Sequence, residues 1–478
     1  MYSQRRVFDW ESQKQFARAS CDFNPIHVDV SAARRTHTGG PIVHGIHSLL
    51  WVLDCAAKAG IATEGASNLK VQFLQPVYVG DEVEVEITRP TPDLLRARML
   101  LDGEEVVAVV CSFNGPRRAL LKVPPHGNCT PPPQRPTELS LSEMAGLRGC
   151  LSFASATAQL DTLFPHAARV FGSHRVAALA YSSCVVGMVV PGLHSMYSGL
   201  EVSLCDDNTT PPDGLVFAVD SIVERFRLVR IAVGARGLRG SLETVSRMPP
   251  VRQHGIARVM SVVPTGEFRN CTALIVGGSR GLGELTAKII AAGGGHPIIT
   301  YATGKHEADR LADELMLAGA KCTTLTYDVR HPAASQLAAL ETSPKQLYYF
   351  ATPPIFRRKA GIFDDRRFAE FNTFYVSGFF DLVQACLRSG SQGLRAFYPS
   401  STALDERPAT MTEYSMAKAA AEVLCADLSR FVPEVQILVR RLPRLPTDQT
   451  NSVVPVKTPD ALDVLLPIVR AMQAETAI

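Results

Sequence analysis

A tyrosine and a lysine four positions apart form a pair whose spacing points to chemistry. Tyr414 and Lys418 lie in a strongly helical run and therefore share one face of that helix. An ammonium group beside a phenol favours the phenolate, which lets Tyr414 donate or accept a proton near neutral pH. Ser401 ends an apolar run upstream, where its hydroxyl can hold a carbonyl oxygen beside the tyrosine. The three residues predict a proton-transfer centre.

A glycine-rich turn lies between a predicted buried strand (273–276) and a predicted helix (282–292). In this context glycines permit a tight turn and a close backbone approach to a pyrophosphate at the helix N-terminus. The residues assigned to cofactor binding in this turn are Gly277, Ser279, Arg280, Gly281, Leu282 and Gly283. Thr300-Tyr301 replaces the acidic residue that would bind a ribose 2′-hydroxyl, while Arg280 and Lys305 can meet a 2′-phosphate. NADP is therefore favoured over NAD.

These features, in this order, resemble the short-chain dehydrogenase/reductase family from residue 270 to the C-terminus. The resemblance implies that Tyr414 is the acid/base and that Lys418 binds the nicotinamide ribose and assists Tyr414. It also implies that Ser401 orients the substrate oxygen. A homo-oligomer formed through this reductase block is among the expected assemblies.

The same resemblance places Asp328 and Val329 at the adenine end of the cofactor, where both also count as cofactor-binding residues. The sequence departs from the family pattern at two points. Residues 350–354 (Phe-Ala-Thr-Pro-Pro) replace the Asn-Asn-Ala-Gly stretch, and Tyr375 stands where a catalytic asparagine is expected.

A second pair able to do chemistry is Asp22 and His27, on either side of Asn24-Pro25. The proline ends the preceding helix, and the turn can bring a carboxylate and an imidazole to one point. Such a pair can activate a water as base and return a proton as acid. Gly45, near the start of the next predicted helix, offers an N–H group and the positive helix end to a thioester oxyanion.

Downstream of this pair the sequence has the run 40–45 (Gly-Pro-Ile-Val-His-Gly), Phe73, Pro76 and Gly80-Asp81. Together with Asp22 and His27, the pattern resembles the MaoC-like (R)-specific enoyl hydratase/dehydratase family of the hot-dog fold. The resemblance implies that Asp22 and His27 are catalytic and that Gly45 is an oxyanion donor. The implied substrate is a 3-hydroxyacyl or enoyl thioester of CoA or of acyl carrier protein. Cys21 replaces the glycine that usually precedes the aspartate.

Two proline-rich stretches, 115–136 and 249–266, divide the chain into three blocks, consistent with its length of 478 residues. The predicted domains are a MaoC-like hot-dog dehydratase (1–120), a second, degenerate hot-dog (140–250) and a short-chain dehydrogenase/reductase domain of Rossmann type (268–478). The expected fold class is multidomain: an α+β double hot-dog followed by an α/β doubly wound parallel sheet.

The first two blocks share one order of elements, a long apolar helix followed by a strand meander. The predicted helices are 11–20, 43–59 and 175–190, and the predicted strands are 69–73, 82–88, 95–101, 106–113, 199–204, 215–223, 226–233 and 241–247. Asp161 and His166 repeat the spacing of the first pair but lack its Asn-Pro turn. The second block is therefore expected to be an inactive partner that completes the acyl tunnel.

Composition excludes several classes of protein. Hydrophobic residues make up 46% of the chain, net charge is +3, and no basic arm indicates a nucleic-acid partner. Eleven cysteines without a Cys-x-x-Cys pair predict reduced thiols in a cytoplasmic protein and no metal site. The N-terminus lacks an apolar signal region, and no run approaches the ~20 apolar residues of a membrane helix.

The sequence thus predicts a bifunctional enzyme, an oxidoreductase and lyase of fatty acid or polyketide metabolism. It would reduce a 3-oxoacyl thioester with NADPH and dehydrate the 3-hydroxyacyl product to a trans-2-enoyl thioester. Hydration followed by oxidation is the alternative direction. Two further hypotheses remain: a non-catalytic acyl-binding hot-dog pair that serves the reductase, and an inert reductase block beside an active hot-dog.

Overall fold

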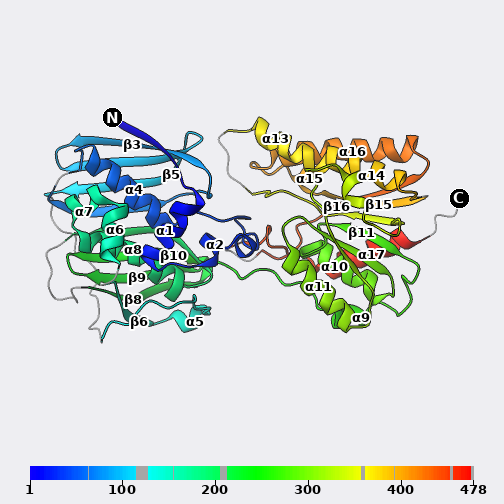
Figure 1. Cartoon of the computed structure of the whole chain (residues 1–478), viewed down its shortest axis with the longest axis horizontal. Helices are drawn as coiled ribbons and strands as arrows, with labels where there is room; N and C mark the ends of the chain where they lie inside the picture. Colours follow the sequence, from blue (N-terminus) through cyan, green and yellow to red (C-terminus); the bar gives the residue numbers. More distant parts are fainter. Residues whose placement is uncertain are drawn as a thin grey trace. The chain divides into compact units, whose positions relative to one another are not determined.

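The chain forms two compact units in a computed structural model (Figure 1). Unit 1 comprises Met1–Pro249 together with the short segment that begins at Ser452, and unit 2 comprises Pro250–Asn451 together with the segment from Val456 onward. The structure describes residues 1–62, 64–114, 128–153, 156–204, 213–356, 361–391, 393–452 and 456–474. Most of the first predicted linker, 115–127, lies outside the described residues.

Unit 1 is built on one antiparallel sheet with the strand order β1-β3-β4-β5-β2-β7-β10-β9-β8-β6. Its strands are β1 (Tyr2–Val7), β2 (Ala66–Phe73), β3 (Glu82–Thr91), β4 (Leu94–Leu101), β5 (Glu104–Phe113), β6 (Arg148–Ser152), β7 (Ser195–Ser203), β8 (Gly214–Val223), β9 (Leu228–Ala235) and β10 (Leu238–Ser246). The order of the first five strands repeats in reverse in the second five, and β2 pairs with β7 where the halves meet. The first two predicted blocks are therefore two similar halves of one sheet.

Helices α1 (Trp10–Ser20), α4 (Gly45–Lys58), α6 (Thr157–Leu163), α7 (Pro165–Phe171) and α8 (Ser173–Cys184) lie against one face of this sheet (Figure 1). The other helical segments of unit 1 are α2 (Pro25–Val28), α3 (Val30–Ala33), α5 (Leu141–Met144), the π-turn η1 (Val185–Val189) and the 3₁₀ turn η2 (Glu224–Phe226). Helices α4 and α8 are buried over most of their length and are the central helices of the two halves. One hydrophobic core contains residues of both halves.

Two edge strands, β1 and β6, were missed by the sequence pattern. In β1 the side chains alternate between half-buried and exposed positions, and none is fully buried. Its register sets Arg5 opposite Glu84 on β3. Because an edge strand needs no continuous apolar face, its sequence carries little of the signal on which strand prediction depends.

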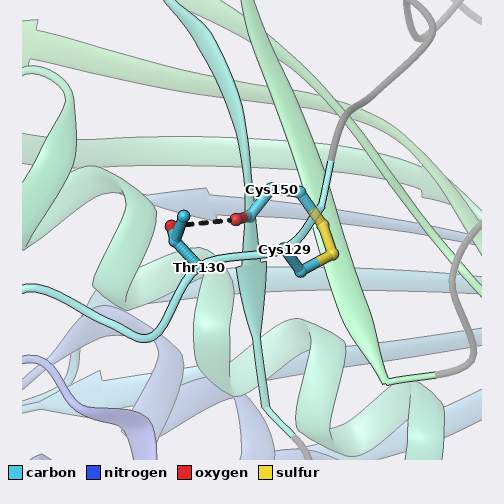
Figure 2. The surroundings of a disulfide bond; sticks show 3 residues. All are labelled: Cys129, Thr130 and Cys150. Carbon is cyan, nitrogen blue, oxygen red and sulfur yellow. Dashed lines mark hydrogen bonds between the residues drawn. A yellow bond between two sulfur atoms is a disulfide. The ribbon is translucent and has the colours of Figure 1, made fainter.

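The cysteines require a correction. The sequence predicts reduced thiols throughout, but Cys129 and Cys150 form a disulfide (Figure 2). Thr130 N donates to Cys150 O at 2.9 Å and Ser152 N donates to Thr130 O at 2.8 Å, so the segment after Cys129 pairs with β6 at the sheet edge. This pairing brings together two cysteines 21 residues apart, a proximity that sequence spacing does not reveal. The other eight cysteines among the described residues are free thiols.

Unit 2 has six parallel strands in the order β13-β12-β11-β14-β15-β16, which is the expected doubly wound sheet. The strands are β11 (Thr272–Val276), β12 (His296–Tyr301), β13 (Thr323–Thr326), β14 (Gln346–Tyr349), β15 (Leu394–Ser401) and β16 (Val435–Leu442). The order reverses between β11 and β14. In such sheets ligands bind at the carboxyl ends of the strands beside this reversal.

Helices cover both faces of the parallel sheet (Figure 1). One hydrophobic core contains residues of α10 (Gly281–Ala292), α11 (Lys305–Leu317) and α17 (Ala461–Gln473), and another contains residues of α14 (Gly378–Arg388) and α16 (Thr412–Phe431). The remaining helices are α9 (Ile256–Met260), α12 (Ala333–Leu337), α13 (Asp365–Asn372), the π-turn η3 (Thr373–Ser377) and α15 (Ala403–Glu406). Within the described ranges, every helix is too short or too polar to cross a membrane.

Candidate functional sites

Asp22 lies directly after α1 and is almost completely buried in unit 1. Its Oδ1 accepts a hydrogen bond from Asn24 N at 3.1 Å, and its Oδ2 accepts one from Ser183 Oγ at 2.6 Å. Cys21 ends α1 in the left-handed conformation (φ 56°), which explains why a glycine is common at this position. The backbone and both carboxylate contacts therefore fix the orientation of Asp22.

The structure brings His27 next to Asp22. His27 Nδ1 lies 2.8 Å from Ile42 O, so Nδ1 carries the proton and Nε2 keeps a free lone pair. The ring of His44 stacks on that of His27, with 3.9 Å between the ring centroids. One carboxylate oxygen of Asp22 and one ring nitrogen from each of His27 and His44 lie within 4.8 Å of one another. A separation of this size suits a single water molecule held between two polar groups.

Burial sets the protonation states of this cluster. It raises the pKa of Asp22, and it lowers the pKa of His27 to about 3, helped by the neighbouring His44. The pKa of His44 is also lowered to about 3 by burial. His27 is therefore a neutral imidazole at neutral pH, as a general base requires. An Asp-His-His set also contains the ligand types of a divalent-metal site.

The second half of unit 1 contributes to this site, which the sequence analysis missed. Ser183 comes from α8 and holds the Asp22 carboxylate. Asn24 Nδ2 donates to Gly187 O at 2.8 Å and to Gly192 O at 3.0 Å. A Cβ atom at Gly187 would lie 2.2 Å from Asp22 Oδ1, so only glycine fits in η1 here. A hydroxyl and a glycine in an otherwise apolar helix were the available signal.

Gly45 is the first residue of α4, where backbone N–H groups have no partner within the helix. A Cβ atom at Gly45 would lie 3.0 Å from the ring of Phe73, so glycine also permits this close packing.

In the second half of unit 1, Asp161 and His166 repeat the spacing of Asp22 and His27 but make other hydrogen bonds. Asp161 Oδ2 accepts from Ser173 Oγ at 2.9 Å, and His166 N donates to Asp54 Oδ1 at 2.8 Å.

In unit 2 the glycine-rich turn joins β11 to α10 at the strand-order reversal. Gly277 (φ 75°) and Gly281 (φ 60°) are in the left-handed region, and a Cβ atom at Gly283 would lie 2.3 Å from Gly277 O. Thr300 supports the turn, because Gly277 N donates to its Oγ1 at 3.2 Å and Gly278 N donates to its O at 3.0 Å. The glycine-rich turn and the N-terminus of α10 together form a site that can bind a pyrophosphate.

The other residues expected at the cofactor site surround this turn. Ser279 is buried, and Leu282 is half-buried in the first turn of α10. Arg280 Nη1 lies 3.5 Å from Asp448 Oδ2, a loose ion pair.

Two further residues lie after β13. Asp328 binds the Arg330 guanidinium, with Nη2 at 2.6 Å from Oδ2. Val329 is buried, and a Cβ atom at Gly378 would lie 2.2 Å from it.

The three proton-transfer residues meet at the end of β15 and on α16. Ser401 lies close enough to Tyr414 to act on the pKa of its phenol, and the Ser401 hydroxyl accepts a hydrogen bond from Ala403 N at 3.1 Å. Lys418 is buried, and its Nζ donates to Pro399 O at 2.7 Å. Tyr375, which the sequence predicts to stand in place of an asparagine, lies on η3, and its hydroxyl lies 2.5 Å from Thr352 Oγ1.

The electrostatics of this centre differ from the sequence-based prediction that Lys418 favours a Tyr414 phenolate. Burial raises the pKa of Tyr414, and the Ser401 hydroxyl opposes the rise only in part. Burial lowers the pKa of Lys418 to about 7. The Lys418 Nζ lies 6.0 Å from the centroid of the Tyr414 ring. At this distance the ammonium does not offset the desolvation that raises the pKa of Tyr414. Tyr414 is therefore a protonated phenol, suited to donate a proton.

Comparisons with known proteins match the two units separately. The MaoC-like domain profile matches residues 3–99, and the short-chain dehydrogenase profile matches residues 271–451. A 3-hydroxybutyryl-CoA dehydratase of Methylorubrum extorquens is 32% identical over 108 residues, which cover 20% of this chain and 68% of that protein. An (R)-specific enoyl-CoA hydratase of Aeromonas caviae is 39% identical over 79 residues, which cover 15% of this chain and 57% of that protein.

Among solved structures, the 3-oxoacyl-(acyl-carrier-protein) reductase of Agrobacterium tumefaciens with NADP bound is similar to part of this chain. The similarity covers 38% of this chain and 73% of that one, with 19% identity and a TM-score of 0.33.

Proposed function

Because the chain belongs to the MaoC-like dehydratase family in its N-terminal part and contains a short-chain dehydrogenase domain in its C-terminal part, we propose that it is a bifunctional acyl-thioester enzyme. Unit 2 reduces a 3-oxoacyl thioester with NADPH. Unit 1 then removes water from the 3-hydroxyacyl product and forms a trans-2-enoyl thioester. The thioester is carried by CoA or by acyl carrier protein, and tethering both sites on one chain raises the local concentration of the shared intermediate.

The observation that carries the lyase half is the buried Asp22-His27 pair with an unprotonated His27 Nε2. In the hydration direction the pair holds a water molecule, takes its proton as the hydroxyl adds to C3, and returns a proton to C2. Dehydration is the reverse of these steps. The Gly45 N–H at the positive end of α4 stabilises the thioester oxygen while negative charge accumulates there.

In unit 2 the protonated Tyr414 donates its phenolic proton to the substrate carbonyl oxygen, and Ser401 orients that oxygen. Lys418 binds the nicotinamide ribose, and the glycine-rich turn binds the pyrophosphate of the dinucleotide. When bound, NADPH supplies the hydride that C3 receives. Arg280 meets the 2′-phosphate, and Asp328 and Val329 contact the adenine end.

A direct test is to incubate the full chain with 3-oxoacyl-CoA thioesters of several lengths and NADPH, and to identify the products by mass. We expect the 3-hydroxyacyl and enoyl thioesters to appear in turn. Tyr414→Phe should abolish NADPH oxidation and leave enoyl hydration intact, since the two acid/base groups lie in different units. Equal loss of both activities in a folded Tyr414→Phe protein would contradict separate sites.

A second test asks whether unit 1 catalyses or only binds. Asp22→Asn and His27→Ala should each lower the enoyl hydration rate by about a hundredfold or more, within the usual range for a lost acid/base group. The double variant should lose little more than the worse single one, because the two groups act on one water.

The matched controls are Asp161→Asn and His166→Ala, which should leave hydration nearly unchanged. If instead these controls abolish hydration, the active half has been assigned wrongly. If the unaltered chain does not hydrate enoyl thioesters, unit 1 is an acyl-binding module. If hydration survives loss of Asp22 and His27, other residues carry the reaction. The opposite reaction order, hydration followed by oxidation, would appear as a preference for NAD⁺ with the 3-hydroxyacyl thioester.

A further inference from the structure

Tyr375 lies in a hydrophobic core of unit 2, and the proposed reaction assigns it no role. It lies on the π-turn η3 between α13 and α14 and is fully buried. Its hydroxyl is bonded to Thr352 Oγ1 at 2.5 Å, and its backbone O accepts from Tyr398 OH at 3.1 Å. These contacts fix the plane and the position of the Tyr375 ring.

The ring faces the ammonium group of Lys418. Lys418 Nζ lies 4.0 Å from the centroid of the Tyr375 ring, 4.7 Å from that of Tyr398 and 6.0 Å from that of Tyr414. The Tyr375 ring is thus the nearest of the three, well within the ~6 Å over which a cation is attracted to an aromatic face. The hydrogen bond from Nζ to Pro399 O completes the surroundings of the ammonium.

A buried ammonium group needs such compensation, because removal from water disfavours its charged form. The charged and titratable groups around Lys418 are few. Glu422 and Cys425 on its own helix favour the cation. Glu422 is already bonded to Ser400 on β15 and to Arg441 on β16. Tyr375 on η3, Tyr398 on β15 and Tyr414 on α16 face Lys418 with aromatic rings, while Glu370 on α13 acts on Tyr375.

We propose that Tyr375 is a positioning residue of the reductase site, whose aromatic ring holds Lys418 in its charged form beside Tyr414. The ring performs this role, and the hydroxyl serves only to anchor the ring through Thr352. An asparagine, the residue expected at this position, has no aromatic face and would offer Lys418 no cation–π contact. The inference rests on the proposed reductase function.

The test compares Tyr375→Phe, which keeps the ring, with Tyr375→Met, which keeps bulk but removes the aromatic face. Tyr375→Leu is a second non-aromatic variant in case the Met variant does not fold. The lysine side chains of the full chain are labelled with ¹³C at Cε, and Lys418→Arg identifies the Lys418 signal. The pKa of Lys418 is then read from an NMR titration.

We expect Tyr375→Met to lower the pKa of Lys418 by about one unit, a tenfold change in its dissociation constant. Tyr375→Phe should leave it within a few tenths of a unit. Since the charged lysine is the active form, the alkaline fall of kcat for 3-oxoacyl reduction should move to lower pH by the same amount in the Met variant only.

An unchanged Lys418 pKa in both non-aromatic variants would overturn the proposal. Equal shifts in the Phe and Met variants would also overturn it, because the hydroxyl would then be the active part. Absence of reductase activity in the unaltered chain would instead refute the proposed function, and the NMR titration would still decide the role of the Tyr375 ring.

Discussion

Burial, more than neighbouring charge, determines the protonation states of the residues expected to do chemistry. Burial lowers the pKa of His27 to about 3 and that of Lys418 to about 7, while it raises the pKa of Asp22 and Tyr414. In every case the neutral form gains relative to the charged one. Titratable residues whose pKa values are shifted by burial are typically clustered at functional sites.

We propose that Arg280 selects NADPH over NADH. It lies in the glycine-rich turn at the N-terminus of α10, and its Nη1 lies 3.5 Å from Asp448 Oδ2. Arg280→Ala should weaken NADPH binding by at least tenfold and NADH binding by less than twofold, because only NADPH carries the 2′-phosphate. Titration of nucleotide fluorescence measures both constants. Lys305→Ala tests the second residue expected at the 2′-phosphate, which is exposed and paired with Asp309. Equal weakening of both nucleotides by Arg280→Ala would refute the NADP assignment.

At the scale of elements, both candidate sites contain a π-turn. Helix α8 continues into η1, which places Gly187 against Asp22, and α13 continues into η3, which places Tyr375 against Lys418. A π-turn inserts one extra residue into a helix and is often found at functional sites. In each unit the turn presents one residue that a regular helix would direct elsewhere.

The contact between η1 and Asp22 can be tested by adding a single methyl group. Gly187→Ala would place Cβ 2.2 Å from Asp22 Oδ1, so the carboxylate must move away from His27. We expect enoyl hydration to fall at least tenfold, with NADPH-dependent reduction unchanged. Gly40→Ala is the matched control, because its Cβ would lie 3.7 Å from Tyr78, an ordinary contact. A Gly187→Ala protein with full hydration activity would show that η1 does not position Asp22.

The Cys129–Cys150 disulfide closes a loop at the edge of the unit 1 sheet (Figure 2). In the chain-entropy description, a loop of 21 residues stabilises the folded state by roughly 3 kcal/mol. Reduction with dithiothreitol should therefore lower the urea midpoint of unit 1, and Cys129→Ser should lower it equally without reductant. Both tryptophans of the chain, Trp10 and Trp51, lie in unit 1, so their fluorescence reports its unfolding. A Cys129→Ser midpoint that still falls on reduction would point to another redox-sensitive group.

At the scale of the whole molecule, the two units have separate hydrophobic cores and separate candidate sites. The lyase residues belong to unit 1 and the reductase residues to unit 2. Each unit is therefore expected to respond by itself to a change that acts only on its own buried groups.

Acid should destabilise unit 1 through its buried histidines. Burial lowers the pKa of His27 and His44 to about 3 and that of His37 to about 4. In the unfolded chain these groups titrate near 6.5, so below that pH the unfolded state binds more protons and stability falls. Each histidine costs roughly 1.4 kcal/mol per pH unit in this window. As the pH falls, Asp22 takes up its proton in the folded state above the ordinary range of an aspartate, because its pKa is raised, and this uptake offsets part of the loss.

The urea midpoint from tryptophan fluorescence should therefore fall between pH 7 and pH 5. His37→Asn should make this fall shallower, since one titrating group is removed. An equal midpoint at pH 7 and pH 5 would show that these histidines are not held in the neutral form.

Sequence alone determined the features that short-range spacing encodes. The glycine-rich turn between strand and helix, the four-residue spacing of Tyr414 and Lys418, and the Asp22 to His27 turn each depend on residues close together in the chain. For the same reason, the sequence pattern predicted the alternation of strands and helices in unit 2. It also predicted, in both halves of unit 1, a helix followed by a strand meander. The expected fold class is confirmed on this basis.

Tertiary structure alone decided the contacts between distant segments. Ser183 and Gly187 reach Asp22 because β2 pairs with β7 and joins the two halves in one sheet, with α8 and η1 packed against it. Cys129 meets Cys150 because the segment that follows Cys129 pairs with β6. The pKa directions at Tyr414 and Lys418 follow from the depth of burial, which depends on packing of the whole unit. Such contacts depend on register and packing, and no local spacing in the chain specifies them.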